Sequence, residues 1–262
     1  MNEDELKKIF NSKGNILYHY TTLDSAIKIV TSNRLKFGKA ANMNDINEQS
    51  RMKFYSLDFA DKMNDEDIDK ELAKYLQISL CIDDKNKGFN IPSMWGHYAE
   101  GGNGACLAFD MKSLLNSTDK SITSKKVRYE KEYDGSIDNI NNIDINKFLW
   151  KKKKIFFVKS KDWSYEQEFR LIKKVDDITN EYFLDYPDDS LIAIILYNNC
   201  PDTVKNSLRY DILNKLTQHQ IFQYTNSVGN RELQLISAMD NITIYPYNKN
   251  VQMDLSADGQ QA

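Results

Sequence analysis

Polar and apolar residues alternate along residues 165–172, YEQEFRLI, and this alternation predicts an extended strand. On such a strand the even-numbered positions share one face, where the charged residues are Glu166, Glu168 and Arg170. Charges of both signs gathered on one face fit a polar cleft. The alternative is an edge strand whose charged face meets water.

The spacing of apolar residues along the rest of the chain predicts strands and helices in mixed order. Strands are expected over residues 16–20, 35–37, 77–82, 105–109, 125–133, 182–186, 191–197, 221–224 and 242–247. Helices are expected over residues 3–10, 23–32, around 52–59, and over 70–76, 93–98, 111–115, 145–158 and 201–216. Residues 232–239 are ambiguous. The expected helix N-caps are Thr21 or Thr22, Ser93, and Asp110.

This order of elements, with no internal repeat and no clear linker, predicts one α+β domain over residues 1–248. Residues 249–262 lose the apolar pattern, so we expect a mobile C-terminal tail. The chain has 262 residues, of which 41% are hydrophobic and 11% aromatic. That composition is sufficient for a full-sized core.

Charge narrows the expected partners. A net charge of −3 argues against a protein that attracts nucleic acid over its whole surface. Local basic stretches occur at Lys125 and Lys126 and in the KKKK run at residues 151–154. That run fits either a solvated helix face or a patch that faces phosphates.

The sequence shows no signal-peptide pattern and no run of 18 apolar residues, so we expect no membrane association. An odd number of cysteines without a secretion signal favours a cytoplasmic location. The cysteines are Cys81, Cys106 and Cys200. The first two fall in apolar strands, where buried and inert thiols are expected.

Several common sites are absent from the sequence. It has no GxGxxG, GxxxxGK[ST] or GxSxG motif, which argues against a Rossmann site, a P-loop or a nucleophile elbow. No cysteine lies in a CxxC motif, and the histidines His19, His97 and His219 lack ligand spacing. We therefore expect no metal site.

The candidate chemistry lies in polar and aromatic segments at residues 18–21 (YHYT), 42–45 (NMND), 94–98 (MWGHY) and 163–170 (WSYEQEFR). All but the second set a histidine or a carboxylate beside tyrosine or tryptophan. Such side chains suit a planar, polar ligand, because rings stack, histidine and hydroxyl groups bind sugar oxygens, and arginine binds phosphate.

The segments LYHYTTLDSAIKIV, NMNDINE, MWGHYAEGGNGACLAFD and KDWSYEQEFRLI occur in this order and resemble the bacterial family called domain of unknown function 2971. The resemblance is strong over residues 17–170. The chain departs from the family pattern at Ile46, where members usually have proline, and at Cys81, where they tend to have serine. Both departures bear on how closely the loop and the ligand contacts follow the family.

The first segment is also similar to the opening of ADP-ribosyltransferase-like folds, including DarT toxins and RNA 2′-phosphotransferases. This resemblance implies a split, mixed β-sheet with flanking helices, and a site that uses NAD as its substrate. It implies that His19 holds the NAD ribose and that Glu168, in a late strand, is the catalytic carboxylate. The other residues expected at the site are Tyr20, Thr21, Asn44, Asp45, Trp95, His97, Tyr98, Trp163, Tyr165 and Arg170.

Alternatives stay open at several of these positions. Glu166 shares a face with Glu168 and could take its catalytic role. His19 could be a core histidine with its hydrogen bonds satisfied, and Asn44 with Asp45 could only shape a turn. Arg170 could pair with Glu166 or bind pyrophosphate. Core packing is the alternative for Trp95 and Trp163, and His97 with Tyr98 would form a pocket wall.

The resemblance implies an NAD-dependent ADP-ribosyltransferase that acts on a nucleic-acid or protein acceptor, used as a toxin or an anti-phage effector, with an antitoxin as a further expected partner. An NAD glycohydrolase is the first alternative. The second is a non-catalytic module that binds a nucleotide or a protein, with Glu168 merely salt-bridged to Arg170.

Overall fold

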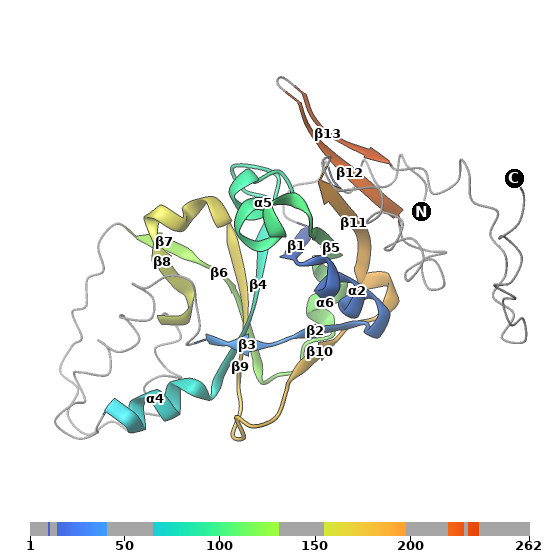
Figure 1. Cartoon of the computed structure of the whole chain (residues 1–262). Coiled ribbons are helices and arrows are strands. Elements are labelled where there is room, and N and C mark those ends of the chain that lie inside the picture. Colours follow the sequence, from blue (N-terminus) through green and yellow to red (C-terminus); the bar gives the residue numbers. More distant parts are fainter. Residues whose placement is uncertain are drawn as a thin grey trace, which may run out of the picture.

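A computed structural model describes residue 10 and residues 15–40, 65–130, 155–197, 220–227 and 230–235. These residues form an α+β structure in which a large, mainly antiparallel sheet carries a few short helices (Figure 1). The strand order of the main sheet is β13-β12-β11-β5-β1-β4-β9-β6, and β3 also pairs with β4. Among these pairs β11 and β12 are parallel, so the sheet is mixed.

The strands of this sheet are β1 (Ile16–Thr21), β3 (Gly38–Lys39), β4 (Tyr75–Ile82), β5 (Ala105–Asp110), β6 (Ile122–Lys126), β9 (Glu168–Lys174), β11 (Leu191–Tyr197), β12 (Gln220–Ser227) and β13 (Asn230–Leu235). Two smaller pairs join β2 (Arg34–Lys36) to β10 (Phe183–Asp185) and β7 (Arg128–Glu130) to β8 (Val158–Ser160). The α-helices are α2 (Leu23–Ser32), α4 (Asp65–Ala73), α5 (Pro92–Tyr98) and α6 (Met111–Asn116). Short 3₁₀ turns are η2 (Glu100–Gly102), η3 (Ile155–Phe157), η4 (Lys161–Glu166) and η5 (Asp188–Ser190).

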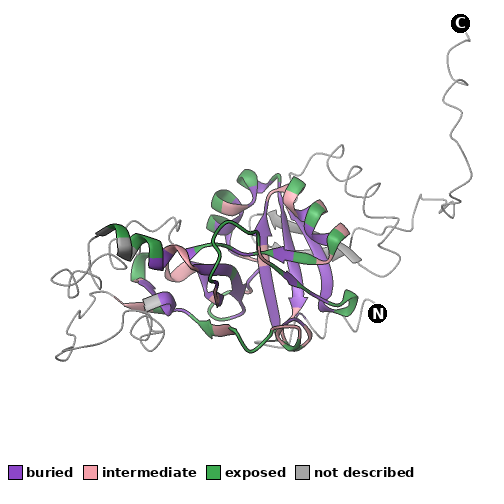
Figure 2. Cartoon of the chain, turned by 90° about the horizontal axis from the view of Figure 1, so that it is seen from below, coloured by how far each residue is buried: buried purple, intermediate pink, exposed green. Residues whose placement is uncertain are grey.

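Apolar clusters cover both faces of the central strands. In β1, Leu17 packs into one cluster, whereas Tyr18 and Tyr20 pack into the other. In β5, Leu107 and Cys106 divide between the clusters in the same way. A strand buried on both faces is apolar at nearly every position, which explains the ACLAF run. Buried positions run through the central strands, whereas the helices place exposed positions outward (Figure 2).

The local signals for two helices are confirmed. The side chain of Thr22 accepts a hydrogen bond from the Ser25 backbone N–H and caps α2, which spans the residues predicted for it. Asp110 caps α6 in the same way through the Ser113 N–H, at 2.7 Å. The strand predicted at residues 191–197 also has the observed bounds of β11.

The sheet opens between β1 and β4. These strands pair only at Leu17↔Ile82 and Tyr18↔Cys81, whereas β1 pairs with β5 along its full length. Beyond Tyr18 the two strands no longer pair. The chain after β2 crosses to the far side of this opening, where Gly38 of β3 pairs with Gln77 of β4 (Figure 1).

Several predicted elements are wrong in detail. The strand predicted over residues 165–172 starts only at Glu168, because η4 ends at Glu166 and Gln167 has a left-handed backbone with φ of 47°. This strand, β9, pairs with β4 and β6 on its two sides, so it is no edge strand. Alternating polar and apolar residues would also suit an edge strand, but here pairing with β4 and β6 places the strand inside the sheet.

Other corrections concern element boundaries. Ser93 does not cap α5, since Ile91 occupies the N-cap position without a side-chain bond and Pro92 begins the helix. Tyr75 and Leu76 belong to β4 rather than to a helix, because β9 and β3 draw them into the sheet. The strand predicted at 125–133 divides at Val127, whose N–H donates to Glu168 O.

The helix predicted at 145–158 is wrong at its described end. Residues 155–157 form η3 and Val158 begins β8, because β8 pairs with β7. Of the ambiguous residues 232–239, the first four belong to β13. Predictions that lie outside the described residues concern the helix at 3–10 except for Phe10, the helices at 52–59 and 201–216, the strand at 242–247, the tail from 249, and Asn44, Asp45, Cys200 and the lysines at 151–154.

Candidate functional site

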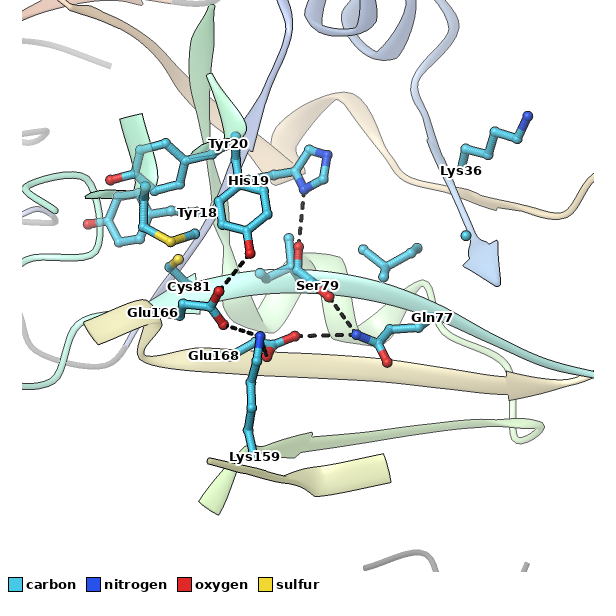
Figure 3. A pocket seen from close by; sticks show the side chains of 15 residues that line it. Tyr18, His19, Tyr20, Lys36, Gln77, Ser79, Cys81, Lys159, Glu166 and Glu168 are labelled. Carbon is cyan, nitrogen blue, oxygen red and sulfur yellow. Dashed lines mark hydrogen bonds and ion pairs between the residues drawn. The ribbon is translucent and has the colours of Figure 1, made fainter. Parts of the chain in front are cut away.

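The opening between β1 and β4 holds a pocket of about 300 Å³ (Figure 3). Its walls come from β1, β4, α5 and the segment from β8 to β9, with β2 and β3 at one side. The lining residues are Tyr18, His19, Tyr20, Lys36, Gly38, Gln77, Ile78, Ser79, Leu80, Cys81, Met94, Tyr98, Lys159, Glu166 and Glu168. The pocket therefore joins residues from the first, third and fourth polar segments of the sequence.

His19 lies on β1 at the point where the strand leaves β4. Its Nδ1 lies 3.2 Å from the backbone oxygen of Ser79, and because a carbonyl oxygen only accepts, Nδ1 carries the donated proton. In the neutral ring Nε2 is then left as a hydrogen-bond acceptor. Burial lowers the pKa of His19, and the bond to Ser79 opposes this only in part. The half-buried ring is thus suited to accept a hydrogen bond from a ligand hydroxyl group through Nε2.

Glu168 is fixed by Arg170. The guanidinium donates to both carboxylate oxygens at 2.7 Å, through Nε to Oε1 and Nη2 to Oε2, and its Nη1 donates to Phe156 O at 2.8 Å. The Gln77 amide adds a longer bond of 3.3 Å to Oε1. Burial acts to raise the pKa of Glu168, but the charge and hydrogen bonds of Arg170 outweigh it and hold the pKa below its usual range.

Glu166 has a different environment. Its Oε1 accepts a hydrogen bond of 2.7 Å from the Tyr98 hydroxyl, and its Oε2 lies 2.6 Å from Lys159 Nζ (Figure 3). Burial raises the pKa of Glu166, which Lys159 only partly offsets, and the nearby charge of Glu168 adds to the rise. The two carboxylates face one pocket, yet their pKa values are displaced in opposite directions.

Gln167 explains how both neighbours reach the pocket. Its side chain binds the loop after β4, since Nε2 donates to Ile82 O at 2.7 Å and to Asn86 O at 2.8 Å, while Oε1 accepts from Asn86 N. The left-handed turn at Gln167 ends η4 and starts β9. Glu166 thus approaches the pocket from a 3₁₀ turn and Glu168 from a strand.

Other residues expected at the site lie around the pocket rather than along its wall. Trp95 is buried in the apolar cluster behind it, where its indole N–H donates to Phe89 O at 2.9 Å and its ring meets Tyr20 edge-on. Arg170 has no exposed surface. The remaining residues of this group are Thr21 at the end of β1, exposed His97, and half-buried Trp163 and Tyr165.

Lys159 also lines the pocket, although no sequence pattern indicated a role for it. Its side chain is 4% exposed, and its Nζ lies 3.8 Å from Glu168 Oε2 and 4.6 Å from the Trp163 ring centre, as well as 2.6 Å from Glu166 Oε2. A lysine is almost never buried unless it is paired. The one available signal was its place between predicted pocket segments, which does not distinguish a buried lysine from a solvated one.

The predicted burial of Cys81 and Cys106 is confirmed, and both are free thiols. Burial raises the pKa of each thiol well above its usual value, so neither is activated as a nucleophile. In the described ranges no group of three or more histidine, cysteine, aspartate or glutamate residues is arranged to hold a metal ion.

The fold and the site define an α+β protein with a polar, two-carboxylate pocket at an opening in its sheet. Residues 94–171 match the sequence model of a family described as Protein of unknown function (DUF2971), which confirms the resemblance to that family. The matched part carries Lys159, both glutamates and Arg170, whereas His19 and β4 lie before it. No curated protein and no solved structure matches the chain. None of the helices in the described ranges has the length and apolar character to cross a membrane.

Proposed function

We propose that the protein binds NAD in the pocket between β1 and β4 and transfers ADP-ribose to a macromolecule, either a nucleic acid or a protein. The observation that carries this proposal is the convergence of His19, Glu166 and Glu168 on one pocket where the sheet opens. The ADP-ribosyltransferase-like resemblance of the sequence points the same way. NAD glycohydrolase activity would follow from the same site if water took the place of the acceptor.

Cleavage of the bond between ribose and nicotinamide in NAD is favoured by a negative charge beside the ribose. When the bond between ribose C1′ and nicotinamide breaks, the electron pair leaves with neutral nicotinamide and the ribose gains oxocarbenium character. A carboxylate in the pocket stabilises this charge. The acceptor nucleophile then forms its bond to C1′ and gives its proton to a carboxylate or to water.

The two glutamates suit different parts of this reaction. Glu168 stays ionised because Arg170 binds both of its oxygens, so it would supply a fixed negative charge. Glu166 has the raised pKa and would take the proton from the acceptor. Opposite displacement of two carboxylate pKa values is the usual sign of such a division. His19 would bind a ribose hydroxyl through Nε2, and the ring of Tyr98 would border the nicotinamide.

A specific observation favours a second candidate, a non-catalytic module that binds a nucleotide or a protein. The positive charge of Arg170 compensates Glu168 at 2.7 Å, which weakens the field that Glu168 projects into the pocket. In this case the glutamates would recognise a ligand without acting on it.

The biological role that we propose is taken from the ADP-ribosyltransferase-like families that the sequence resembles. We propose a cytoplasmic effector of the toxin or anti-phage type, held inactive by an antitoxin partner. For a nucleic-acid acceptor, exposed Lys125 and Lys126 on β6 are candidate contacts, and binding should weaken as salt rises.

The test is nicotinamide release from NAD by the full chain, with and without DNA, RNA or cell extract. Glu168→Gln should lower turnover by about 100-fold or more while NAD still binds. Asp185→Asn makes the same change at an exposed site and should leave turnover as it is. Release that needs an extract component shows a transferase, whereas release without one shows a hydrolase. NAD binding with no release under any condition would instead establish the binding module.

A further inference from the structure

Lys159 projects from β8 into the space between the two glutamates of the pocket (Figure 3). Its Nζ makes a 2.6 Å ion pair with Glu166 Oε2 and lies 3.8 Å from Glu168 Oε2. The Trp163 ring lies against the ammonium at 4.6 Å, a distance that suits a cation–π contact. Such a buried ammonium is stable only because these partners replace its water.

The groups that face Glu166 come from several elements. Tyr98 of α5 donates to it, while Glu168 of β9, Cys81 of β4 and Tyr129 of β7 lie close enough to interact through charge. Burial raises the pKa of both Cys81 and Tyr129, so these two groups stay neutral near pH 7. Glu168 repels a second negative charge, and Lys159 opposes that repulsion.

We propose that Lys159 is a positioning residue that holds Glu166 as an oriented carboxylate in the pocket, ready to accept the proton of the incoming nucleophile. Arg170 neutralises the charge of Glu168, and Lys159 neutralises that of Glu166, so each glutamate has its own cation. The role in proton transfer rests on the proposed function, whereas the effect on Glu166 does not.

The structure predicts what happens when the ammonium is removed. Lys159→Met keeps an unbranched apolar stem but leaves Glu166 buried beside Glu168 without a cation. A carboxylate in that position takes up a proton rather than stay charged. Since an opposite charge within about 4–6 Å lowers a carboxyl pKa by roughly 1–3 units, its loss should raise the titration midpoint of Glu166 by a similar amount.

The test is a pH titration of the full chain with ¹³C-labelled glutamate carboxyl groups, in which Glu166→Gln identifies the Glu166 signal. Lys159→Met should move this midpoint up by about 1–3 units. Lys159→Arg keeps the charge and should leave it near its original value. Lys161→Met is the matched control, because it removes an exposed lysine two residues away. An unchanged midpoint in Lys159→Met, or an equal shift in Lys161→Met, would overturn the proposal.

If Lys159→Met does not fold, Tyr98→Phe provides the second test. It removes the other hydrogen bond to Glu166 and should raise the midpoint in the same direction by a smaller step. The absence of any such step would again count against the arrangement, because Tyr98 and Lys159 each bind one oxygen of Glu166.

Turnover of NAD by the same variants tests the catalytic part. Lys159→Met should move the acid limb of the pH–rate profile to higher pH by the step seen in the titration, and Lys159→Arg should restore the original profile. A shifted titration with an unshifted profile refutes the proton-transfer role alone. A shifted titration in a protein that never releases nicotinamide refutes the proposed function but leaves Lys159 as the residue that keeps Glu166 ionised.

Discussion

Arg170 binds both carboxylate oxygens of Glu168 at 2.7 Å, and its guanidinium is fully withdrawn from solvent. The two residues are neighbours on the same face of β9, one strand repeat apart, so their backbone places the pair without a long-range contact. The third guanidinium contact, to Phe156 O, joins β9 to η3. The pair thus fixes Glu168, which lines the pocket, and ties β9 to η3.

Arg170→Met should destabilise the protein strongly, by about 3–5 kcal/mol, because it leaves the Glu168 carboxylate buried without its partner. Urea unfolding followed by circular dichroism measures this loss. Arg34→Met is the control, since the Arg34–Asp185 ion pair is largely exposed and should cost about 1 kcal/mol or less.

The double variant Glu168→Gln with Arg170→Met separates the charge effect from lost packing. With the carboxylate neutralised, much of the lost stability should return. A double variant no more stable than Arg170→Met would show that the cost lies in packing and in the contact to Phe156.

Gln167→Ala should loosen the loop after β4 without unfolding the sheet. The backbone N–H of Asn86 loses its acceptor, Gln167 Oε1 at 2.7 Å. The backbone oxygens of Ile82 and Asn86 lose the donor Gln167 Nε2. Local protection should fall by about 1–3 kcal/mol, so the Asn86 amide should exchange with solvent roughly 5- to 150-fold faster.

The comparison amide for that exchange measurement is Ser113, which also donates to a side chain, that of Asp110, but at the cap of α6. Its exchange rate should not change. Equal acceleration at both amides would indicate that the variant lowers global stability rather than releasing one loop.

The elements predicted best from sequence are those whose signals are local. The run LIAIILY gave β11, and Thr22 and Asp110 gave the starts of α2 and α6, because each depends on residues next to one another. The alternation at 165–172 gave the common face of Glu168 and Arg170 but not the turn at Gln167, which its contacts with the loop after β4 stabilise.

Lys159 shows the same limit at the site. In the sequence it resembles any lysine near a basic run, and a side chain of that type usually lies in water. Its burial depends on pairing with Glu166, on Trp163, and on the β7–β8 pair that turns it inward. The sequence therefore indicated which types of side chain line part of the candidate site. Which charged side chains pair with one another could be seen only in the folded structure.

Asp119 gives a prediction about pH. Hydrogen bonds from Ser121 and then the ammonium of Lys173 lower the pKa of this carboxyl from 3.8 to about 2. Because the folded pKa lies below the unfolded one, the contribution to stability is complete above about pH 4 and is lost as pH falls towards 2.

Asp119→Asn should therefore lower the melting temperature at pH 7 and make little difference near pH 2. The side chain of Asp119 is 59% exposed, so the effect at pH 7 should be small. Melting curves of both proteins across this range measure it. A constant difference at every pH would mean that the ionised carboxylate contributes nothing of its own.

Two glycines, Gly96 in α5 and Gly104 just before β5, should respond in opposite ways to alanine. A β-carbon on Gly104 would lie 2.3 Å from Thr21 O and 2.9 Å from the Ala99 Cα, so β1 and the end of α5 would have to move apart. A β-carbon on Gly96, within α5, meets no atom within 4 Å.

Gly104→Ala should destabilise the protein by roughly 1–3 kcal/mol, as overpacking does. Gly96→Ala should stabilise it by roughly 0.5–1 kcal/mol, because alanine loses less backbone entropy in a helix. Urea unfolding of both variants checks the pair, and a stabilising Gly104→Ala would show that the backbone around Gly104 is less closely packed than these distances indicate.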